Sequence, residues 1–378
     1  MPRPRLREAG IQIGELPPGA LNAITDVAGV RVGHATLVAG EGRLRPGQGP
    51  IRTGVTVILP YGGNVFRQKV RGAVHTINGF GKACGFEEVR ELGVIEAPIA
   101  LTNTLNVGLV ADALVTYSLS QSPEIGIQTG TVNVVVGECN DGFLNDIQGR
   151  HVRAAHVHAA LEAATEGPVA EGAVGAGTGT SCFGWKGGIG TASRVVPSGA
   201  GGYTVGALVQ SNFGRPHDLT ICGVPVGQRI APPGSGPGVT REQGSIMIVL
   251  ATDAPLVSRQ LGRLCGRAGV GLARSGSHHA HGSGDFVIAF STAQRIEHDP
   301  AALTMTATLL ADERAAMTWL FPAVAEAVEE AILNSLFRAE TVVGRDGNVR
   351  HALPLKDVLA MLRDSSAEGS RSGERRVP

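Results

Sequence analysis

SIMIVLAT, residues 245–252, is the clearest strand signal in this chain of 378 residues. A short run of β-branched and other apolar residues, without polar alternation, is typical of a strand buried on both faces. A helix is predicted directly after it, over residues Ser258–Ala273, and another strand over Asp285–Ser291. These three elements indicate a protein that mixes strands and helices around a buried sheet.

The remaining predicted elements follow one another in an irregular order. Strands are predicted at Gly54–Pro60, Thr129–Val136, Gly172–Gly177, Thr191–Val196 and Tyr203–Val209. Helices are predicted at Asn103–Ser118, Arg150–Glu166 and within Leu309–Ala339, where Pro322 predicts a kink or break. A doubly wound parallel sheet would need stricter alternation of strand and helix. The pattern therefore favours a layered α/β sandwich, with residues 1–378 forming a single domain.

Two segments lack the signals of regular structure. Arg229–Gly244 (RIAPPGSGPGVTREQG) is rich in Pro and Gly, which predicts an exposed loop or linker. After Arg363 the chain is polar, and residues 364–378 are predicted to form a disordered tail.

Composition excludes several classes of function. The 33 Lys and Arg residues equal the 33 Asp and Glu residues, so the chain lacks the net basic charge expected of a protein that binds nucleic acid or an anionic membrane. No apolar run is long enough for a membrane span, and the N-terminus lacks the apolar region of a secretory signal. We therefore expect a cytoplasmic protein.

The cysteines do not indicate a disulfide framework or a metal site. They are widely spaced, with no C-x-x-C pair: Cys84, Cys139, Cys182, Cys222 and Cys265. Three neighbouring histidines, His278, His279 and His281, could in principle bind a metal, but a solvated loop near an active site is the favoured interpretation. We expect neither a metal nor a cofactor.

Common enzyme motifs are missing. Gly172–Gly190 (GAVGAGTGTSCFGWKGGIG) fits neither a dinucleotide nor a phosphate loop, and tight turns between strands are its predicted use. The sequence contains no H-E-x-x-H motif and no G-x-S-x-G elbow.

The step Gly244-Ser245 permits a distinctive chemistry. A serine hydroxyl preceded by glycine can attack the carbonyl before it, because no Cβ blocks the approach, and the resulting ester can hydrolyse. The product would be a serine at a new N-terminus. Its α-amine, with an ordinary pKa near 8, could act as general base for its own hydroxyl.

Several longer motifs carry a resemblance to a known family. GAVGAGTG with KGGIGTASR, VGALVQSNFG, GSIMIVLATDAPL and HGSGDFVIAFST, together with LTNTLNVG and NDGFLND, resemble the L-aminopeptidase D-Ala-esterase/amidase family. This is the serine peptidase group of the DmpA and β-aminopeptidase type. The motifs occur in order from about Leu16 to about Leu362, which is most of the chain.

The resemblance implies a self-cleaving precursor. Cleavage at Gly244-Ser245 would give an α chain of residues 1–244 and a β chain of residues 245–378 that stay associated. The implied fold is an αββα sandwich that resembles the N-terminal nucleophile hydrolases but has a different strand connectivity. The resemblance also implies a homo-oligomer of αβ units, four being suspected.

The resemblance also implies a set of catalytic residues. The second serine and the acid of the family fall on Ser283 and Asp285 in H-G-S-G-D, and its oxyanion-stabilising asparagine falls on Asn212 in Q-S-N-F-G. Ser245 Oγ would attack the carbonyl of the N-terminal residue of a small peptide, amide or ester. Phe143 stands where some relatives carry tyrosine, so no hydroxyl is available there.

Asp285 and four further residues are candidates for substrate binding. Removing one residue at a time requires a negative group that pairs with the substrate ammonium, and either Asp285 or a second acid such as Glu138 could supply it. The pocket is expected around Phe143, Asn103 and Trp185. An acyltransferase or specialised amidase acting on an acylated metabolite would keep the same core and differ only in this pocket, so that alternative stays open.

Overall fold

The computed structural model describes residues 3–234 and 244–373. The predicted central strand is β11 (Gly244–Thr252), which lies inside a six-stranded sheet. Its neighbours are the antiparallel β10 (Thr204–Asn212) and the parallel β12 (Ser283–Glu297). The remaining strands are β9 (Ile189–Val195), next to β10, and β3 (Gln68–Gly79) and β4 (Val94–Ile95), which follow β12 in that order. Because β11 is paired on both edges and residues 245–252 are all buried, its continuous apolar run is explained.

A second sheet of four strands packs face to face on the first. It contains, in order, β1 (Arg31–Ala39), β2 (Ile51–Leu59), β5 (Ile99–Asn103) and β6 (Val135–Cys139). Ile58 and Leu101 of this sheet share one apolar cluster with Val249 and Ile288 of the six-stranded sheet. The two sheets therefore enclose a common core.

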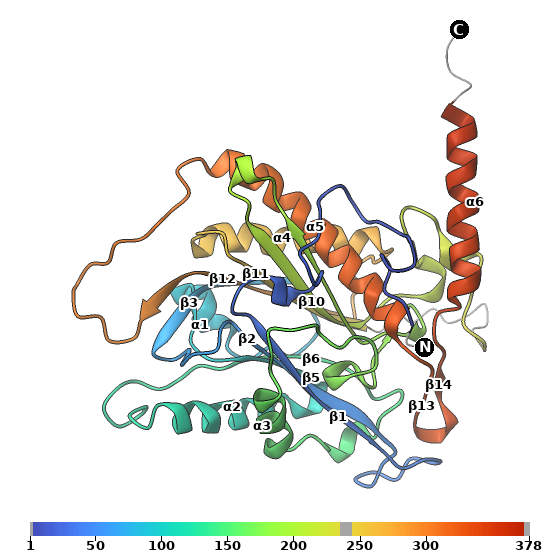
Figure 1. Cartoon of the computed structure of the whole chain (residues 1–378). Helices are drawn as coiled ribbons and strands as arrows, with labels where there is room; N and C mark the ends of the chain where they lie inside the picture. The colour runs from blue at the N-terminus through green and yellow to red at the C-terminus, as the bar shows by residue number, and fades with distance from the viewer. Residues whose placement is uncertain (1–2, 235–243, 374–378) are drawn as a thin grey trace.

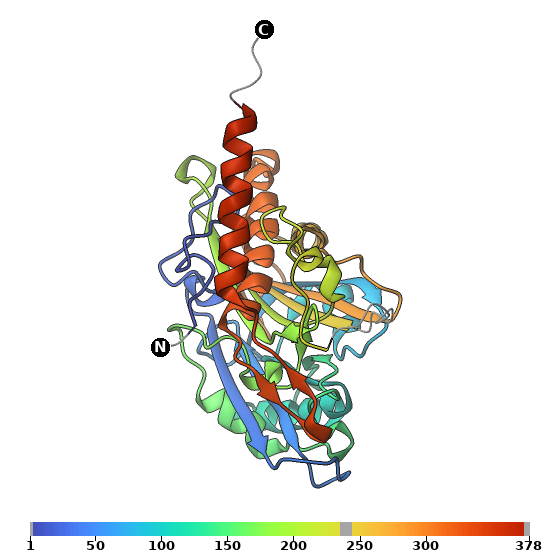
Figure 2. The same ribbon diagram turned by 90° about the vertical axis from the view of Figure 1, so that its right-hand side faces the viewer.

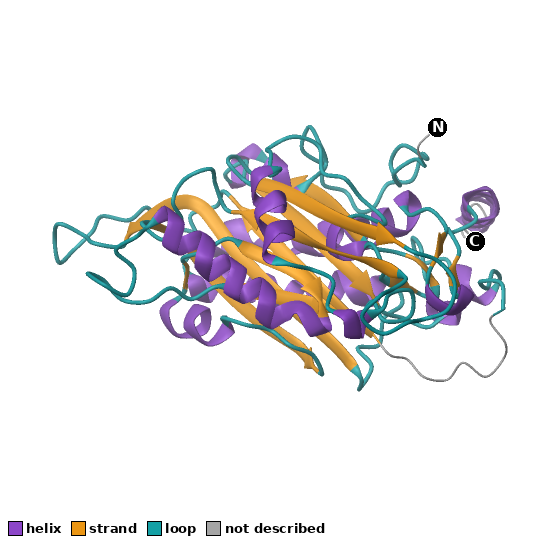
Figure 3. Ribbon diagram, turned by 90° about the horizontal axis from the view of Figure 1, so that it is seen from below, coloured by secondary structure: helices purple, strands orange, loops and turns teal. Residues whose placement is uncertain are grey.

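Helices cover the outer face of each sheet (Figure 1). The four-stranded sheet packs against α2 (Val107–Gln121) and α3 (Ala154–Glu162), and the six-stranded sheet against α4 (Ser258–Arg274) and α5 (Glu313–Arg338). Seen from below, helices lie across the strands of the sandwich (Figure 3). The layers run helix, sheet, sheet, helix, which confirms the predicted αββα sandwich.

Two predicted strands need correction. Gly172–Gly177 is a loop with a 3-10 turn at Gly175–Gly177, because Gly172 and Gly175 have φ angles of 83° and 50°, which no strand residue adopts. Strand β6 begins only at Val135, later than the predicted Thr129. Residues before it bind a side chain instead of a neighbouring strand, since the backbone N–H of Asn133 donates to Glu96.

The helix predicted around Pro322 is not broken there. Helix α5 continues from Glu313 to Arg338, and residues 323–337 are all buried. Losing one hydrogen bond at a proline costs about 3 kcal/mol, which the burial of this long apolar segment offsets.

The C-terminal segment is helical where disorder is predicted. Helix α6 (Leu355–Gly373) begins with Val358 and Leu362 packed on the core, and each further residue can extend an existing helix by one hydrogen bond. Figure 2 shows α6 rising away from the sandwich. Residues 374–378 of the predicted tail, and residues 235–243 of the predicted linker, lie outside the described residues. In the part of the chain that is described, no helix has both the length and the apolar character needed to cross a bilayer.

Candidate active site

Three neighbouring strands of the six-stranded sheet bring the predicted catalytic residues together. Asn212 ends β10, Ser245 is the second residue of β11, and Ser283 begins β12. The ladders pair Asn212 with Ser245 and Gly244 with Ser283. Residues far apart in sequence therefore meet at one end of the sheet because β10 runs antiparallel to β11 and β12 runs parallel to it.

Asn212 points its amide group at the hydroxyl of Ser245. Its Nδ2 donates a hydrogen bond to Ser245 Oγ at 3.3 Å, and both side chains are buried. The other end of the amide is fixed, because Asn212 Oδ1 accepts a hydrogen bond of 3.1 Å from the backbone N–H of Ser181. A backbone N–H can only donate, so this contact sets which end of the amide faces Ser245.

Ser283 and Asp285 form a buried pair on β12. The Ser283 hydroxyl donates to Asp285 Oδ1 at 2.6 Å. Burial raises the pKa of Asp285 above its ordinary value, and the hydrogen bond from Ser283 and the nearby His279 oppose that shift. The register with β3 shifts by one residue beside Asp285, at Ile77. Such bulges re-aim side chains next to functional sites.

Gly244 is required by packing as well as by the proposed chemistry. A Cβ at this position would lie 2.9 Å from the Cα of Phe213 and 3.2 Å from the carbonyl oxygen of Asn212. Both are backbone atoms of the neighbouring chain segment, so they cannot move aside easily. Any side chain at residue 244 would therefore displace the segment that carries Asn212.

The four-stranded sheet supplies the opposite wall with Glu138 and Asn103, at the ends of β6 and β5. The Glu138 carboxylate is 4% exposed and accepts hydrogen bonds from the Lys82 backbone, at 3.0 Å, and from the Thr104 hydroxyl. Asn103 donates to Thr53 Oγ1 at 2.8 Å, and its Oδ1 caps the following turn. Asn103 thus holds the wall in shape through contacts within the protein.

Phe143 is partly exposed and contacts Arg350, whereas Trp185 is buried in the core. Phe143 is 40% exposed, and the Arg350 guanidinium lies 3.7 Å from its ring centroid. Trp185, in the short strand β8 (Trp185–Lys186), is buried in the same apolar cluster as Phe183 and Phe213. Its Nε1 has no hydrogen-bond partner among the described residues.

Two residues at the site carry no signal in the sequence. The buried thiol of Cys139 donates to the carbonyl of Gln210 at 3.3 Å, and burial raises the pKa of this thiol while the nearby Ser245 opposes the shift. Asn78 of β3 pairs with Asp285 and donates from its side chain to the carbonyls of Ala280 and Ser283, at 3.0 and 2.5 Å. Only the sheet register reveals these contacts, because nothing in a linear motif reports which strands become neighbours.

Asp141 in the NDGFLND motif is a further buried acid. It accepts a hydrogen bond of 3.0 Å from Asn145, while its Oδ2 has no partner among the described residues. Burial raises the pKa of Asp141 to about 7, although the polar side chains of Thr53, Asn145 and Asn103 oppose the shift.

The glycine-rich segment forms tight turns around a buried lysine. Lys186 Nζ donates to the carbonyl oxygens of Gly177, Thr180 and Gly187, at 2.9, 2.7 and 2.7 Å. These three backbone carbonyl oxygens therefore point inward at the side-chain nitrogen of Lys186. This arrangement agrees with the predicted use of the segment as turns between strands, and it leads directly to Ser181, which orients Asn212.

The three clustered histidines lie on the loop that precedes Ser283. His279 Nδ1 is 3.5 Å from Asp285 Oδ2, and the His281 ring packs near Phe80. Across the described ranges, no group of three or more His, Cys, Asp or Glu side chains is arranged to hold a metal ion.

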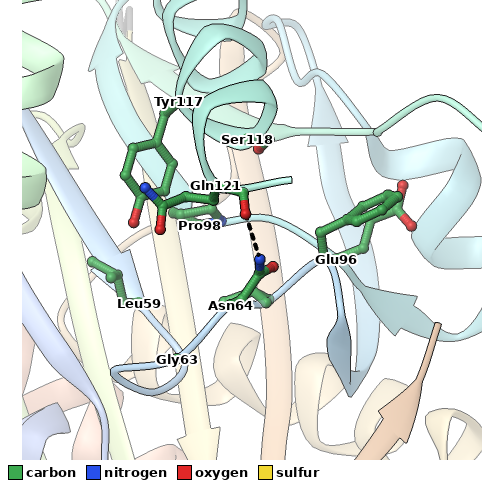
Figure 4. A pocket seen from close by; sticks show the side chains of 10 residues that line it. Leu59, Gly63, Asn64, Glu96, Pro98, Tyr117, Ser118 and Gln121 are labelled. Carbon is green, nitrogen blue, oxygen red and sulfur yellow. Dashed lines mark hydrogen bonds between the residues drawn. The ribbon is translucent and has the colours of Figure 1, made fainter. Parts of the chain in front are cut away.

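A small cavity lies elsewhere, beside α2. Its lining includes Asn64, Glu96 and Tyr117, and Asn64 donates to the carbonyl of Gln121 at 3.1 Å (Figure 4). Its volume of about 10 Å³ has room for about one water molecule and none for a peptide.

Comparisons with known proteins cover most of the chain. Residues 22–350 match the model of peptidase family S58. The β-peptidyl aminopeptidase BapA of Sphingosinicella microcystinivorans is 42% identical over 372 residues, which cover 95% of this chain and 92% of that protein.

Solved structures agree in fold over nearly the whole chain. The PH0078 protein from Pyrococcus horikoshii OT3 superposes with a TM-score of 0.90 at 51% identity, covering 96% of this chain and 99% of that one. The L-aminopeptidase D-Ala-esterase/amidase from Ochrobactrum anthropi superposes with a TM-score of 0.86 at 38% identity, with the same coverage. The latter is described as a prototype of the serine aminopeptidases and a new variant of the Ntn hydrolase fold.

Proposed function

The chain belongs to peptidase family S58 and is a serine aminopeptidase, and from this premise we propose that Ser245 is its nucleophile, released by self-cleavage of the Gly244-Ser245 bond. The α chain would then be residues 1–244 and the β chain residues 245–378. The observation that carries the proposal is the 3.3 Å contact between Asn212 Nδ2 and Ser245 Oγ, with the Ser283–Asp285 pair on the adjacent strand.

The residues divide the work of acyl transfer. The Ser245 α-amine takes the hydroxyl proton while Oγ attacks the substrate carbonyl. Asn212 Nδ2 stabilises the negative charge that develops on the carbonyl oxygen, and Ser283 with Asp285 orients the α-amine and relays protons. Water then releases the acyl group from Ser245. A single buried end of the sheet thus supplies the nucleophile, the base and the oxyanion donor.

Glu138 supports removal of one residue at a time. It is a buried carboxylate, and a Cβ on Gly81 would lie 3.3 Å from its Oε1 and 3.2 Å from the Cα of Gly284, the residue that pairs with Ser245. An ammonium group paired with Glu138 would place the first carbonyl of the substrate beside Ser245. The substrates proposed are therefore small peptides, amides and esters with a free N-terminal amine. The names of the relatives extend this set to β-amino acid and D-alanine derivatives.

The assembled enzyme is proposed to be a homo-oligomer of αβ units, four being suspected, in the cytoplasm. Light scattering of the purified, processed protein measures the stoichiometry directly.

Intact mass and hydrolysis together test the nucleophile. The wild-type protein should give two fragments, the smaller beginning Ser245-Ile246-Met247, and should hydrolyse L-alanyl, D-alanyl or β-alanyl p-nitroanilide. Ser245→Ala should stay a single chain without activity. Ser291→Ala is the control, because Ser291 donates to the Ala254 carbonyl near the far end of β11, away from the site. Activity in Ser245→Ala would disprove the assignment, and transfer to an added amine in preference to water would favour the acyltransferase.

A further inference from the structure

Asp285 is a buried acid with one oxygen left unpaired. Its Oδ1 accepts the hydrogen bond from Ser283, while Oδ2 has no hydrogen-bond partner among the described residues. The residue is only 1% exposed. A carboxyl group that gains and loses a proton during turnover needs a route to water, and Asp285 has no direct one.

His279 lies between this acid and the solvent. Its Nδ1 is 3.5 Å from Asp285 Oδ2, slightly beyond hydrogen-bonding distance, and is itself buried with no other partner in the described part of the chain. The side chain as a whole is 28% exposed. One end of the imidazole ring therefore faces Asp285, and the exposed remainder meets solvent.

The backbone of His279 adopts an energetically unfavourable conformation at this position. Its φ of 51° lies in the left-handed region, which non-glycine residues adopt rarely and which costs about 1–3 kcal/mol. The His279 N–H is held by Ser277 Oγ at 3.2 Å, and Asn78 holds the next turn of the loop through the Ala280 carbonyl. Strain of this kind persists where the surroundings fix one conformation.

Among the described residues near Asp285, no other group combines these properties. Ser283 on its own strand is buried, β3 contributes the uncharged Asn78, and β11 contributes Ser245. From β6, the thiol Cys139 is buried, and the acid Glu138, on the opposite face of the strand, is buried and already accepts hydrogen bonds from Lys82 and Thr104. Histidine is the side chain that ordinarily gains and loses a proton near neutral pH.

We propose that His279 is a positioning residue that carries protons between Asp285 and bulk water. A small rotation of the ring brings its Nδ1 lone pair onto the proton of Asp285 Oδ2. The proton passes to Nδ1, which leaves a carboxylate and an imidazolium, and the imidazolium releases a proton from Nε2 to water. The reverse sequence reloads Asp285. His279 forms no bond to substrate, and the inference rests on the proposed function of the same site.

Two variants separate proton transfer from loop structure. His279→Asn suits the left-handed backbone and can hydrogen-bond Asp285, but it cannot titrate. His279→Gly suits the same backbone and leaves space for added imidazole. His278→Asn is the matched control, since His278 is the exposed neighbour on the same loop.

We expect both His279 variants to be cleaved into two chains and to keep their KM. Their kcat should fall about tenfold or more, within the range of general acid–base catalysis, and imidazole should restore His279→Gly in proportion to its concentration. His278→Asn should behave as wild type. If His279→Asn keeps the wild-type kcat and pH profile, or if imidazole has no effect on His279→Gly, the proposal is wrong. Activity in Ser245→Ala would instead overturn the proposed function.

Discussion

Asn212 and Ser245 face each other across the β10–β11 ladder, and their side chains are joined by a 3.3 Å hydrogen bond from amide to hydroxyl. The backbone N–H of Ser181 holds the opposite end of the amide. The donor is therefore in position before any substrate arrives. Preorganised donors of this kind stabilise a developing oxyanion without further rearrangement.

Removing the donor should slow the chemical step. We expect Asn212→Ala to lower kcat by about 10²–10³, with a much smaller change in KM, because the hydrogen bond strengthens as negative charge develops. Asn212→Asp is the informative companion, since its carboxylate still accepts from Ser181 but has no N–H to donate. Steady-state kinetics with an aminoacyl p-nitroanilide measure both. Equal activity in wild type and Asn212→Asp would rule out the oxyanion role.

A side chain at residue 244 should block self-cleavage. In Gly244→Ala the new Cβ would press on the backbone of Phe213 and displace the strand end that carries Asn212. We expect the purified variant to remain largely a single chain by intact mass. Gly262→Ala is the control, because nothing lies within 4 Å of the corresponding Cβ in helix α4. It should be cleaved normally, and complete cleavage of Gly244→Ala would contradict the packing argument.

The sequence predicts much of this architecture because buried strands and amphipathic helices leave local patterns. The central strand, the helix after it and the layered class are all recovered in this way. The errors come from contacts that are not local. Asn133 is held by Glu96, and Pro322 is tolerated because the rest of α5 is buried. Asn78 and Cys139 reach the site through strand register, which no linear pattern records.

Glu138 should matter only for substrates with a free amine. Replacing it by Gln keeps an acceptor for the Lys82 backbone but removes the negative charge. We expect KM for alanyl p-nitroanilide to rise about 10- to 100-fold, since hydrogen bonds to charged groups contribute about 1.5–3 kcal/mol. An N-acetylated ester, which lacks the ammonium group, should be hydrolysed equally by both proteins. A similar loss with the two substrates would show that Glu138 acts on structure instead.

Asp141 should make stability depend on pH. Burial raises its pKa to about 7, so its contribution to stability is fully present below about pH 4 and is lost as the pH rises through 7. The nearby Lys186, whose pKa burial lowers to about 7, changes its contribution only above that pH. Asp141→Asn removes the ionisable group, so its Tm relative to wild type should rise steadily between pH 5 and 7.5.

Asp146, in the same NDGFLND motif, should affect stability with the opposite pH dependence. Burial alone would raise its pKa, but hydrogen bonds from His151 and from backbone N–H groups lower it overall, so its contribution is present above the ordinary pKa of aspartate. Asp146→Asn should therefore lower Tm at neutral pH and do so less at pH 4. Thermal melts of wild type, Asp141→Asn and Asp146→Asn between pH 4 and 7.5 compare the two opposite pH dependences of stability directly. Parallel curves for Asp141→Asn and wild type would show that Asp141 is already ionised in the folded protein at pH 5.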